Sequence, residues 1–423
     1  MSYFTKTSDL SLNPIARVQI RDRLAGAAFA GLRVVIATAL FSLLGVRALA
    51  GAPATNHFTF LAHAFLRGTF SVGALPDSYA DTIQVGSQVF LPMGPAPAML
   101  LMPFVSISGV AFDELWLSLG LTGLNAWLLN LILRQIGILD PNKRRWLLAL
   151  FLIGTIYFAA MVLGRSWFLS HISTTMFLLL AIYLWLRGRA PGLVGLLLGL
   201  SFLTRSSTLL ALPFFLMLAA HRSSGGRTVR DALAIALGLA APVIFFFVYN
   251  YARFGHILET GYAYALPGAP ILREALRYGL VSPVHIPKNI YMLLFSAPEP
   301  IPGLGAPVLQ FPWILPSRWG MGLFWTTPAF VYAFFANYRQ RLAQAAAVAV
   351  FAILPLLLMY YGVGYSQFGY RYGIDFFPFL FILTALGLHA RWSWAAKFLI
   401  VTSIVVNIWG AWCAMFGLFA EPG

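Results

Sequence analysis

The stretch Asp77-Ser-Tyr-Ala-Asp81, followed closely by Gly86-Ser-Gln-Val-Phe-Leu-Pro-Met-Gly-Pro-Ala-Pro97, interrupts a chain that is otherwise mostly apolar. It places two carboxylates in a polar loop whose proline and glycine content opposes a helix or a central strand. The run from Phe90 to Gly109 decides the topology, because its hydropathy would allow a membrane crossing whereas its four prolines oppose a regular helix. We therefore expect a re-entrant or interfacial segment there.

Composition places the chain among membrane proteins. Hydrophobic residues make up 60% of its 423 residues and charged residues only 10%, and the mean hydropathy is +0.80. These values predict an all-α, polytopic helical bundle forming one transmembrane domain over residues 1–423. The net charge of +15 resides mostly in short Lys and Arg clusters between apolar runs, a pattern of membrane orientation rather than of nucleic-acid binding. Because Cys413 is the only cysteine, intramolecular disulfides and thiolate metal sites are excluded.

The apolar runs predict about eleven spans, at about 20 residues per crossing. The first is expected at 27–49, as a retained span that follows a basic, cytoplasmic N-terminus. The run 192–220 is too long for one comfortable crossing and is interrupted at Thr204-Arg-Ser-Ser207, so we expect two short spans that meet outside at Arg205. The other spans are expected at about 112–136, 146–163, 167–187, 232–251, 317–338, 343–361, 376–389 and 398–419.

With these spans, every tight basic cluster falls on one side of the membrane, which the positive-inside rule makes cytoplasmic. Residues 142–145 and 221–230 are then inside. The first outer loop, about 50–111, and a long loop, about 252–316, are outside. The apolar residues that repeat with helical spacing in the first loop, and so predict an interfacial helix, are Phe58, Leu61, Ala62, Phe65 and Leu66.

Charged residues in the outer loops occur singly, among aromatic residues and prolines. Charges next to a membrane core are costly unless they are paired or solvated, so a collection on one side is a functional-site hypothesis. The residues of this collection are Asp77, Asp81, Arg165, His171, Arg205, Glu259, Lys288, Arg371 and Asp375.

Four segments occur in a fixed order, the first of them within the first outer loop: Phe90-Leu-Pro-Met-Gly-Pro-Ala-Pro-Ala98, Gly199-Leu-Ser-Phe-Leu-Thr-Arg205, Tyr249-Asn-Tyr-Ala-Arg-Phe-Gly255 and Gln367-Phe-Gly-Tyr-Arg-Tyr-Gly-Ile-Asp375. In order and sidedness, this layout resembles the membrane glycosyltransferases of the GT-C fold, which include protein O-mannosyltransferases and bacterial aminoarabinose transferases of lipid A. The resemblance implies transfer of a sugar from a polyprenyl-phosphate carrier to a glycan, lipid or protein acceptor, with inversion at the anomeric carbon. It also implies a bacterial inner membrane with the active site on the outer face.

The resemblance further implies an acidic general base in the first outer loop. Directly after the first span, where the commonest family pattern has this residue, the chain has Asn56-His57. Asp81 is therefore the leading candidate, with Asp77 and His57 as alternatives, because a carboxylate or imidazole near the reacting oxygen can take the proton of an acceptor hydroxyl. The competing interpretation of both aspartates is a turn or helix cap.

Arginines are the candidates for binding the carrier phosphate, because a planar guanidinium matches phosphate oxygens bidentately. Arg371 and Arg205 are the strongest, and the alternatives are an ion pair with Asp375 for Arg371 and snorkelling to the interface for Arg205. Weaker phosphate-binding candidates are Arg165 and Lys288, and residues that support the acceptor or the fold are Asp375, Glu259, His171 and Asn56. The sequence has no metal-binding motif, so no metal and no cofactor besides the lipid-linked sugar donor are expected.

Two other classes of function are compatible with the sequence. A lipid or small-molecule transporter or flippase ordinarily has inverted repeats and ionisable residues at mid-membrane. We find no internal repeat, and Arg33 is the main ionisable exception. A polysaccharide polymerase or ligase would share the outer arginines and the long outer loop.

Overall fold

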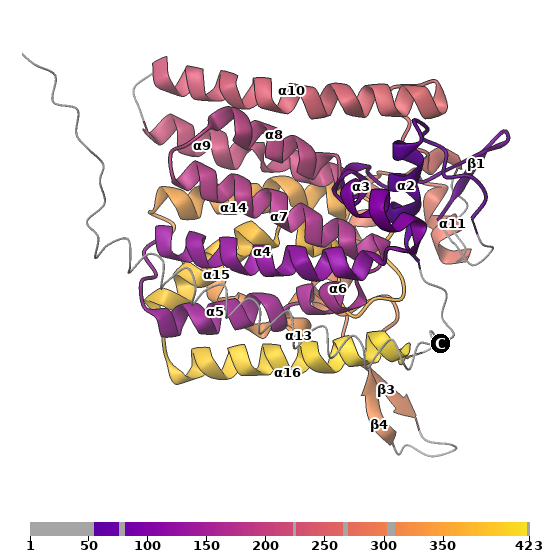
Figure 1. Ribbon diagram of the computed structural model, residues 1–423. Helices are drawn as coiled ribbons and strands as arrows, with labels where there is room; N and C mark the ends of the chain where they lie inside the picture. The colour runs from indigo at the N-terminus through magenta and orange to yellow at the C-terminus, as the bar shows by residue number, and fades with distance from the viewer. Residues whose placement is uncertain (1–54, 76–80, 223–225, 265–269, 303–308, 421–423) are drawn as a thin grey trace, which may run out of the picture.

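The computed structural model describes residues 55–75, 81–222, 226–264, 270–302 and 309–420, and its long helices lie side by side in one bundle (Figure 1). Within these ranges, α5 (Pro141–Ile153) and α6 (Tyr157–Leu163) are separated by a 59° bend. Taken together as one broken helix, this pair is long and apolar enough to be a sixth span. The five helices that are each long and apolar enough to cross a membrane are α4 (Glu114–Gln135), α7 (Ser166–Leu186), α10 (Gly226–Phe254), α14 (Arg341–Leu358) and α16 (Trp394–Phe416).

The predicted number of about eleven spans is not confirmed, because four of the predicted spans form short or irregular helices. The α8 helix has 12 residues, so it rises only about 18 Å, whereas the hydrocarbon core is about 30 Å thick. The first predicted span, 27–49, lies outside the described residues. The elements that occupy the four shorter runs are α8 (Pro191–Phe202), η2 (Ser206–Ala211) with α9 (Leu212–Arg222), α13 (Leu323–Thr326) with η6 (Pro328–Phe335), and α15 (Phe377–Ala390).

Local sequence signals fix several helix starts. The Asp113 side chain accepts from the Leu115 amide and starts α4, and Asp140 does the same for Asn142 at the start of α5. Ser393 accepts from the Ala396 amide at the start of α16. Such N-caps satisfy amides that have no partner inside the helix, which makes these boundaries readable from sequence.

Most of the segments between the spans gather at one end of the bundle (Figure 1). The labelled elements at this end are α2 (His57–Leu66), α3 (Ala96–Ser108), α11 (Pro270–Leu276), the hairpin of β1 (Ile83–Val85) and β2 (Gln88–Phe90), and the hairpin of β3 (Glu299–Pro302) and β4 (Leu309–Leu315). The remaining short elements are η1 (Gly109–Ala111), η3 (Tyr262–Tyr264), η4 (Pro283–His285), α12 (Ile286–Ile290), η5 (Tyr291–Phe295) and η7 (Arg371–Asp375). The basic clusters that begin α5, α10 and α14 lie at the opposite end.

Two predictions about the first outer loop need correction. The predicted interfacial helix exists as α2, but it packs against α3 and the Phe58, Leu61 and Ala62 side chains are fully buried, whereas Leu66 is 42% exposed. Most of its apolar stripe therefore faces protein. Residues 96–108 form a regular helix although Pro103 lies inside it. Pro97 lies in the first turn of this helix, where a proline is well tolerated because the missing amide needs no partner. With 13 residues α3 is still too short for a full crossing.

Candidate functional site

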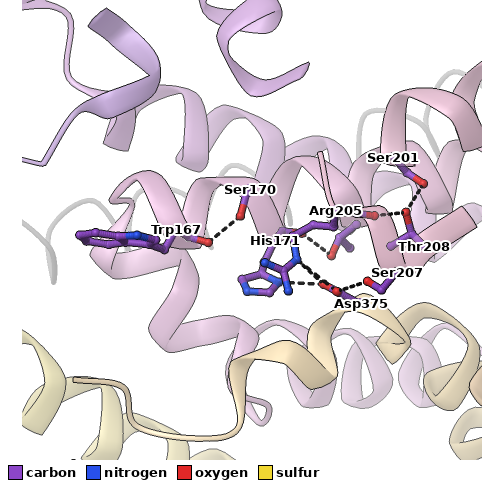
Figure 2. Close-up of polar contacts among 9 residues, drawn as sticks. Trp167, Ser170, His171, Ser201, Arg205, Ser207, Thr208 and Asp375 are labelled. Atoms are coloured by element: carbon purple, nitrogen blue, oxygen red, sulfur yellow. Dashed lines mark hydrogen bonds and ion pairs between the residues drawn. The ribbon is translucent and has the colours of Figure 1, made fainter. Parts of the chain in front are cut away.

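The candidate site begins at the break between α8 and η2. There Arg205 has an extended backbone, with φ -143° and ψ 107°. The Thr208 hydroxyl closes the turn, donating to the Arg205 carbonyl (2.8 Å) and bonding to Ser201 Oγ (2.8 Å; Figure 2). The predicted interruption is confirmed, since α8 ends at Phe202 and η2 begins at Ser206. Hydroxyl side chains favour such a break because they compete with the helical backbone for hydrogen bonds.

The proline-rich loop before α3 rests directly on this break. A Cβ atom on Gly94 would lie 2.2 Å from the Leu203 carbonyl oxygen, so only glycine allows this approach. The buried Arg253 holds the same loop, since its Nη1 donates to the Leu91 carbonyl (2.7 Å) and its guanidinium lies 3.7 Å from the centre of the Tyr249 ring. Two of the segments singled out in the sequence are therefore packed together around the break.

Asp375, the last residue of η7, is completely buried and accepts hydrogen bonds from three side chains (Figure 2). Its oxygens receive Arg205 Nε at 3.0 and 3.1 Å, Ser207 Oγ at 2.5 Å and His171 Nδ1 at 3.0 Å. Burial alone would raise the pKa of Asp375, but the Arg205 charge and these hydrogen bonds lower it to about 2. The buried ion pair is thus Asp375–Arg205, whereas the sequence had suggested Asp375 with Arg371.

Arg205 has one nitrogen fixed and two available. Its Nε is committed to Asp375, while its terminal amino groups bond to none of the described residues, and its side chain is 23% exposed. Burial lowers the pKa of Arg205, but the Asp375 carboxylate more than compensates and raises it. A permanently charged guanidinium, held in one orientation with its free end accessible, is suited to bind an anion.

The aromatic ring of Tyr372 lies near both candidate arginines. The Arg205 and Arg371 guanidinium carbons lie 5.1 and 5.5 Å from its centre. Arg371 also lies 5.5 Å from the Phe168 ring, and its Nη1 donates to the Tyr365 carbonyl (3.4 Å). The structure therefore brings the two strongest phosphate-binding candidates into one neighbourhood.

Tyr372 belongs to a group of four tyrosines, which we call the tyrosine cluster: Tyr262, Tyr360, Tyr361 and Tyr372. Ring centres lie 5.7 Å apart for Tyr360 and Tyr372, 4.9 Å for Tyr360 and Tyr361, and 6.4 Å for Tyr262 and Tyr360, all near edge-to-face. The Tyr360 side chain is close enough to Tyr262 and to Tyr361 to affect the pKa of both. The cluster unites η3, the segment after α14, and η7.

Asp81 lies beside the tyrosine cluster. It has a left-handed backbone (φ 62°) and an exposed side chain, and it forms no hydrogen bond or ion pair with the described part of the chain. Burial raises the pKa of Tyr262 and of Tyr361, and the nearby Asp81 carboxylate raises both further. Tyr262 is also close enough to Arg205 to be influenced by its charge. Asp77, the second predicted carboxylate, lies outside the described residues.

Lys288 and Glu259 shape the backbone around this cluster. Lys288 Nζ donates to the Tyr361 carbonyl (2.6 Å), and burial lowers the pKa of this lysine. Glu259 Oε1 accepts from the Gly261 amide (2.5 Å), which fixes the turn immediately before Tyr262. Both residues thus support the walls of the site.

His57, Asn56 and Arg165 belong to a different polar group. His57 is fully buried and its Nδ1 bonds to Ser166 Oγ (2.9 Å), while Asn56 Oδ1 accepts from the Glu114 amide (3.4 Å). These contacts join the starts of α2, α4 and α7. Arg165 precedes α7, and burial lowers its pKa while the Asp113 charge opposes that effect.

His171 is positioned inside the site but is not accessible. Because the Asp375 carboxylate can only accept, His171 Nδ1 donates to it, and Nε2 has no hydrogen-bond partner among the described residues. The ring is completely buried in α7. His171 therefore holds Asp375 in place.

Sequence reasoning missed Ser207, Arg253 and the tyrosine cluster. Tyr262 gives no separate signal in the sequence, because isolated aromatic residues in outer loops ordinarily belong to an interfacial belt. The available signals were the Tyr360-Tyr361 pair and the alternation of Tyr370 and Tyr372 in a chain that otherwise prefers Phe, with 36 Phe and 17 Tyr.

The described residues include no group of three or more His, Cys, Asp or Glu that could hold a metal ion. Comparison with known proteins gives no family model, no curated protein and no solved structure that matches this chain. Any assignment of activity therefore depends on the chemistry of the site.

Proposed function

We propose that this chain is a membrane glycosyltransferase that moves a sugar from a polyprenyl-phosphate carrier to an acceptor hydroxyl on the outer face of a bacterial inner membrane. The observation that carries the proposal is the arrangement around Arg205. Asp375, Ser207 and His171 together fix the arginine through one carboxylate, and its guanidinium lies 5.1 Å from the centre of the Tyr372 ring. Tyr262 of the same cluster is close enough to Asp81 for that carboxylate to raise its pKa. One region thus has a cation for a phosphate and a carboxylate for a proton.

Sugar transfer needs both groups. The acceptor oxygen forms a bond to the anomeric carbon while the bond between that carbon and the carrier phosphate oxygen breaks. Polyprenyl phosphate leaves with the bonding electron pair, and the acceptor proton passes to Asp81. Arg205 and Arg371 stabilise the charge that develops on the leaving phosphate, and a guanidinium that is already oriented needs little reorganisation to do so.

Asp81 is the best candidate base among the described residues. Asp375 is fully buried and committed to three donors, so it cannot reach an acceptor. His57 is buried against Ser166. Asp81 is exposed and uncommitted, and its left-handed backbone projects it from a loop rather than from a helix. Attack from the side opposite the phosphate would invert the anomeric carbon.

The test is sugar transfer by purified protein in nanodiscs, with undecaprenyl phosphate esters of labelled sugars as donors and a cell-envelope extract as acceptor. Asp81→Asn preserves shape and removes the base, so transfer should fall about 10²- to 10⁴-fold, with melting temperature and carrier binding unchanged. Glu274→Gln is the matched control, because Glu274 is an exposed carboxylate that forms an i,i+3 ion pair with Arg277, and it should transfer normally.

Three results would change the proposal. Normal transfer by Asp81→Asn together with inactivity of Asp77→Asn or His57→Ala would move the base to another residue. Normal transfer by all three variants would contradict this mechanism. Movement of the labelled lipid between leaflets without sugar transfer would favour a flippase.

A further inference from the structure

The tyrosine cluster places four hydroxyl groups in a largely buried aromatic region. Tyr361 and Tyr372 are buried and Tyr262 and Tyr360 are half-buried, yet all four carry a hydroxyl. Elsewhere this chain fills comparable aromatic contacts with Phe, as between Phe330 and Phe377 or between Phe151 and Phe381. Burying a hydroxyl is unfavourable unless it is hydrogen-bonded, so packing alone does not account for four tyrosines.

The hydroxyls of Tyr262, Tyr360 and Tyr361 stay neutral across the physiological range. Burial raises the pKa of Tyr262 and, more strongly, that of Tyr360, and neighbouring tyrosines raise both further. A neutral phenol donates one hydrogen bond and also accepts. Hydrogen bonds of this kind, next to aromatic faces, match a neutral ligand that has several hydroxyls and an apolar face.

The cluster also lies between groups of opposite charge. The Asp81 carboxylate raises the pKa of Tyr262 and the Arg205 guanidinium lowers it, so Tyr262 is near both charges. The Arg205 and Arg371 guanidinium groups lie over the Tyr372 ring. In the transfer reaction the sugar is the only part of the donor that must contact both the phosphate side and the base side. A neutral, hydroxyl-rich surface between them is therefore at the position of the sugar.

We infer that the tyrosine cluster binds the sugar of the lipid-linked donor, with hydrogen bonds from Tyr262 and Tyr360 to the sugar hydroxyls and the aromatic faces against its ring. The inference rests on the proposed function. It predicts that the cluster distinguishes a glycosylated carrier from the bare carrier, whereas Arg205 contacts the phosphate that both have in common.

Binding of two lipids to the full-length protein in nanodiscs tests this. The probes are undecaprenyl phosphate and its mannosyl or glucosyl ester. Tyr360→Phe keeps the ring and removes the hydroxyl that the inference assigns to the sugar, so affinity for the better glycosyl ester should fall about 3- to 10-fold, with affinity for undecaprenyl phosphate unchanged. Arg205→Lys should weaken binding of both lipids alike.

Two further variants make the result decisive. Tyr338→Phe is the matched control, because its hydroxyl donates to the Ala333 carbonyl (2.8 Å) outside the cluster, and it should bind both lipids normally. Tyr262→Phe is the second cluster variant, in case Tyr360→Phe melts at a lower temperature. An equal loss for both lipids, or no loss for either in folded cluster variants, would overturn the assignment while leaving the proposed function intact. If the unmodified protein binds neither lipid, the proposed function fails together with this inference.

Discussion

Two carboxylates near the tyrosine cluster have different roles because their neighbours differ. Asp375 accepts from Arg205, Ser207 and His171 inside the protein, whereas Asp81 is exposed in a loop. A buried carboxylate with several donors remains ionised and holds its partners in place. An exposed carboxylate without a partner can accept a proton, so the residue type alone does not assign the role.

The charge of Asp375 should contribute to stability in a defined pH range. Its pKa is 3.8 in an unperturbed carboxyl and about 2 in the folded protein, so folding favours the ionised form. This contribution is complete above about pH 4 and is lost as the pH falls through about 2. Asp375→Asn leaves Arg205 without its partner and should lower the melting temperature at neutral pH.

Melting curves of the wild type and Asp375→Asn in detergent, from pH 8 down to pH 2, measure this effect. The difference in melting temperature should be constant above about pH 5 and should shrink between about pH 4 and pH 2. A difference that does not depend on pH in this range would show that the Asp375 charge does not stabilise the fold.

At the scale of elements, the break between α8 and η2 determines where Arg205 lies. A continuous helix would keep the backbone of residues 203–205 regular, and no neighbouring loop could approach the Leu203 carbonyl so closely. The Gly94 loop and the Thr208 hydroxyl instead use the carbonyls that the break exposes. The loop and the break therefore depend on each other.

Gly94→Ala should separate the two elements. Its Cβ would lie 2.2 Å from the Leu203 carbonyl oxygen and 2.8 Å from that of Thr204, so the loop must move. We expect a lower melting temperature. We also expect weaker binding of undecaprenyl phosphate, because Arg205 is the residue after Thr204 and would be displaced with it. Gly120→Ala in α4 is the control: no atom lies within 4 Å of its added Cβ, and Ala favours a helix by up to about 1 kcal/mol.

Both properties can be measured on the same purified preparations. Thermal melting in detergent reports stability, and lipid binding in nanodiscs reports the geometry of the site. If Gly94→Ala melts and binds like Gly120→Ala, then the close contact does not hold the break in place.

At the scale of the whole molecule, the two ends of the bundle have different chemistry. Basic clusters begin α5, α10 and α14 at one end, while α2, α3, α11 and both hairpins lie at the other (Figure 1). Positive charge next to spans is retained in the cytoplasm. The orientation, with 142–145 and 221–230 inside and 51–110 and 252–316 outside, stays a prediction.

Cysteine labelling of intact cells tests this orientation. Arg145 and Arg273 are both exposed, and each is replaced by cysteine in a Cys413→Ser background. The two variants should differ in their reaction with a membrane-impermeant maleimide. Arg273→Cys should be labelled in intact cells, and Arg145→Cys only after the membrane is opened. Labelling of Arg145→Cys from outside would reverse the orientation and would remove the proposed site from the outer face.

The sequence by itself determined the features that depend on local composition and spacing. Apolar runs predicted the long helices, because covering about 30 Å of hydrocarbon requires about 20 such residues wherever the chain goes. The interruption at Thr204-Arg-Ser-Ser207 predicted a break, because hydroxyls compete locally with the helical backbone. The sequence also singled out Asp81, Arg205 and Arg371, because isolated charges beside apolar runs are costly, and their roles stay predictions.

Only the tertiary structure decided which of these residues meet. Asp375 lies 170 residues from Arg205 in sequence and 204 from His171, and nothing in the local pattern identifies it as the partner of Arg205 rather than of the adjacent Arg371. The tyrosine cluster likewise joins distant segments. Short apolar helices such as α8 were counted as spans because hydropathy reports burial without distinguishing lipid from protein. Pairings between remote side chains arise from packing, which a linear pattern does not encode.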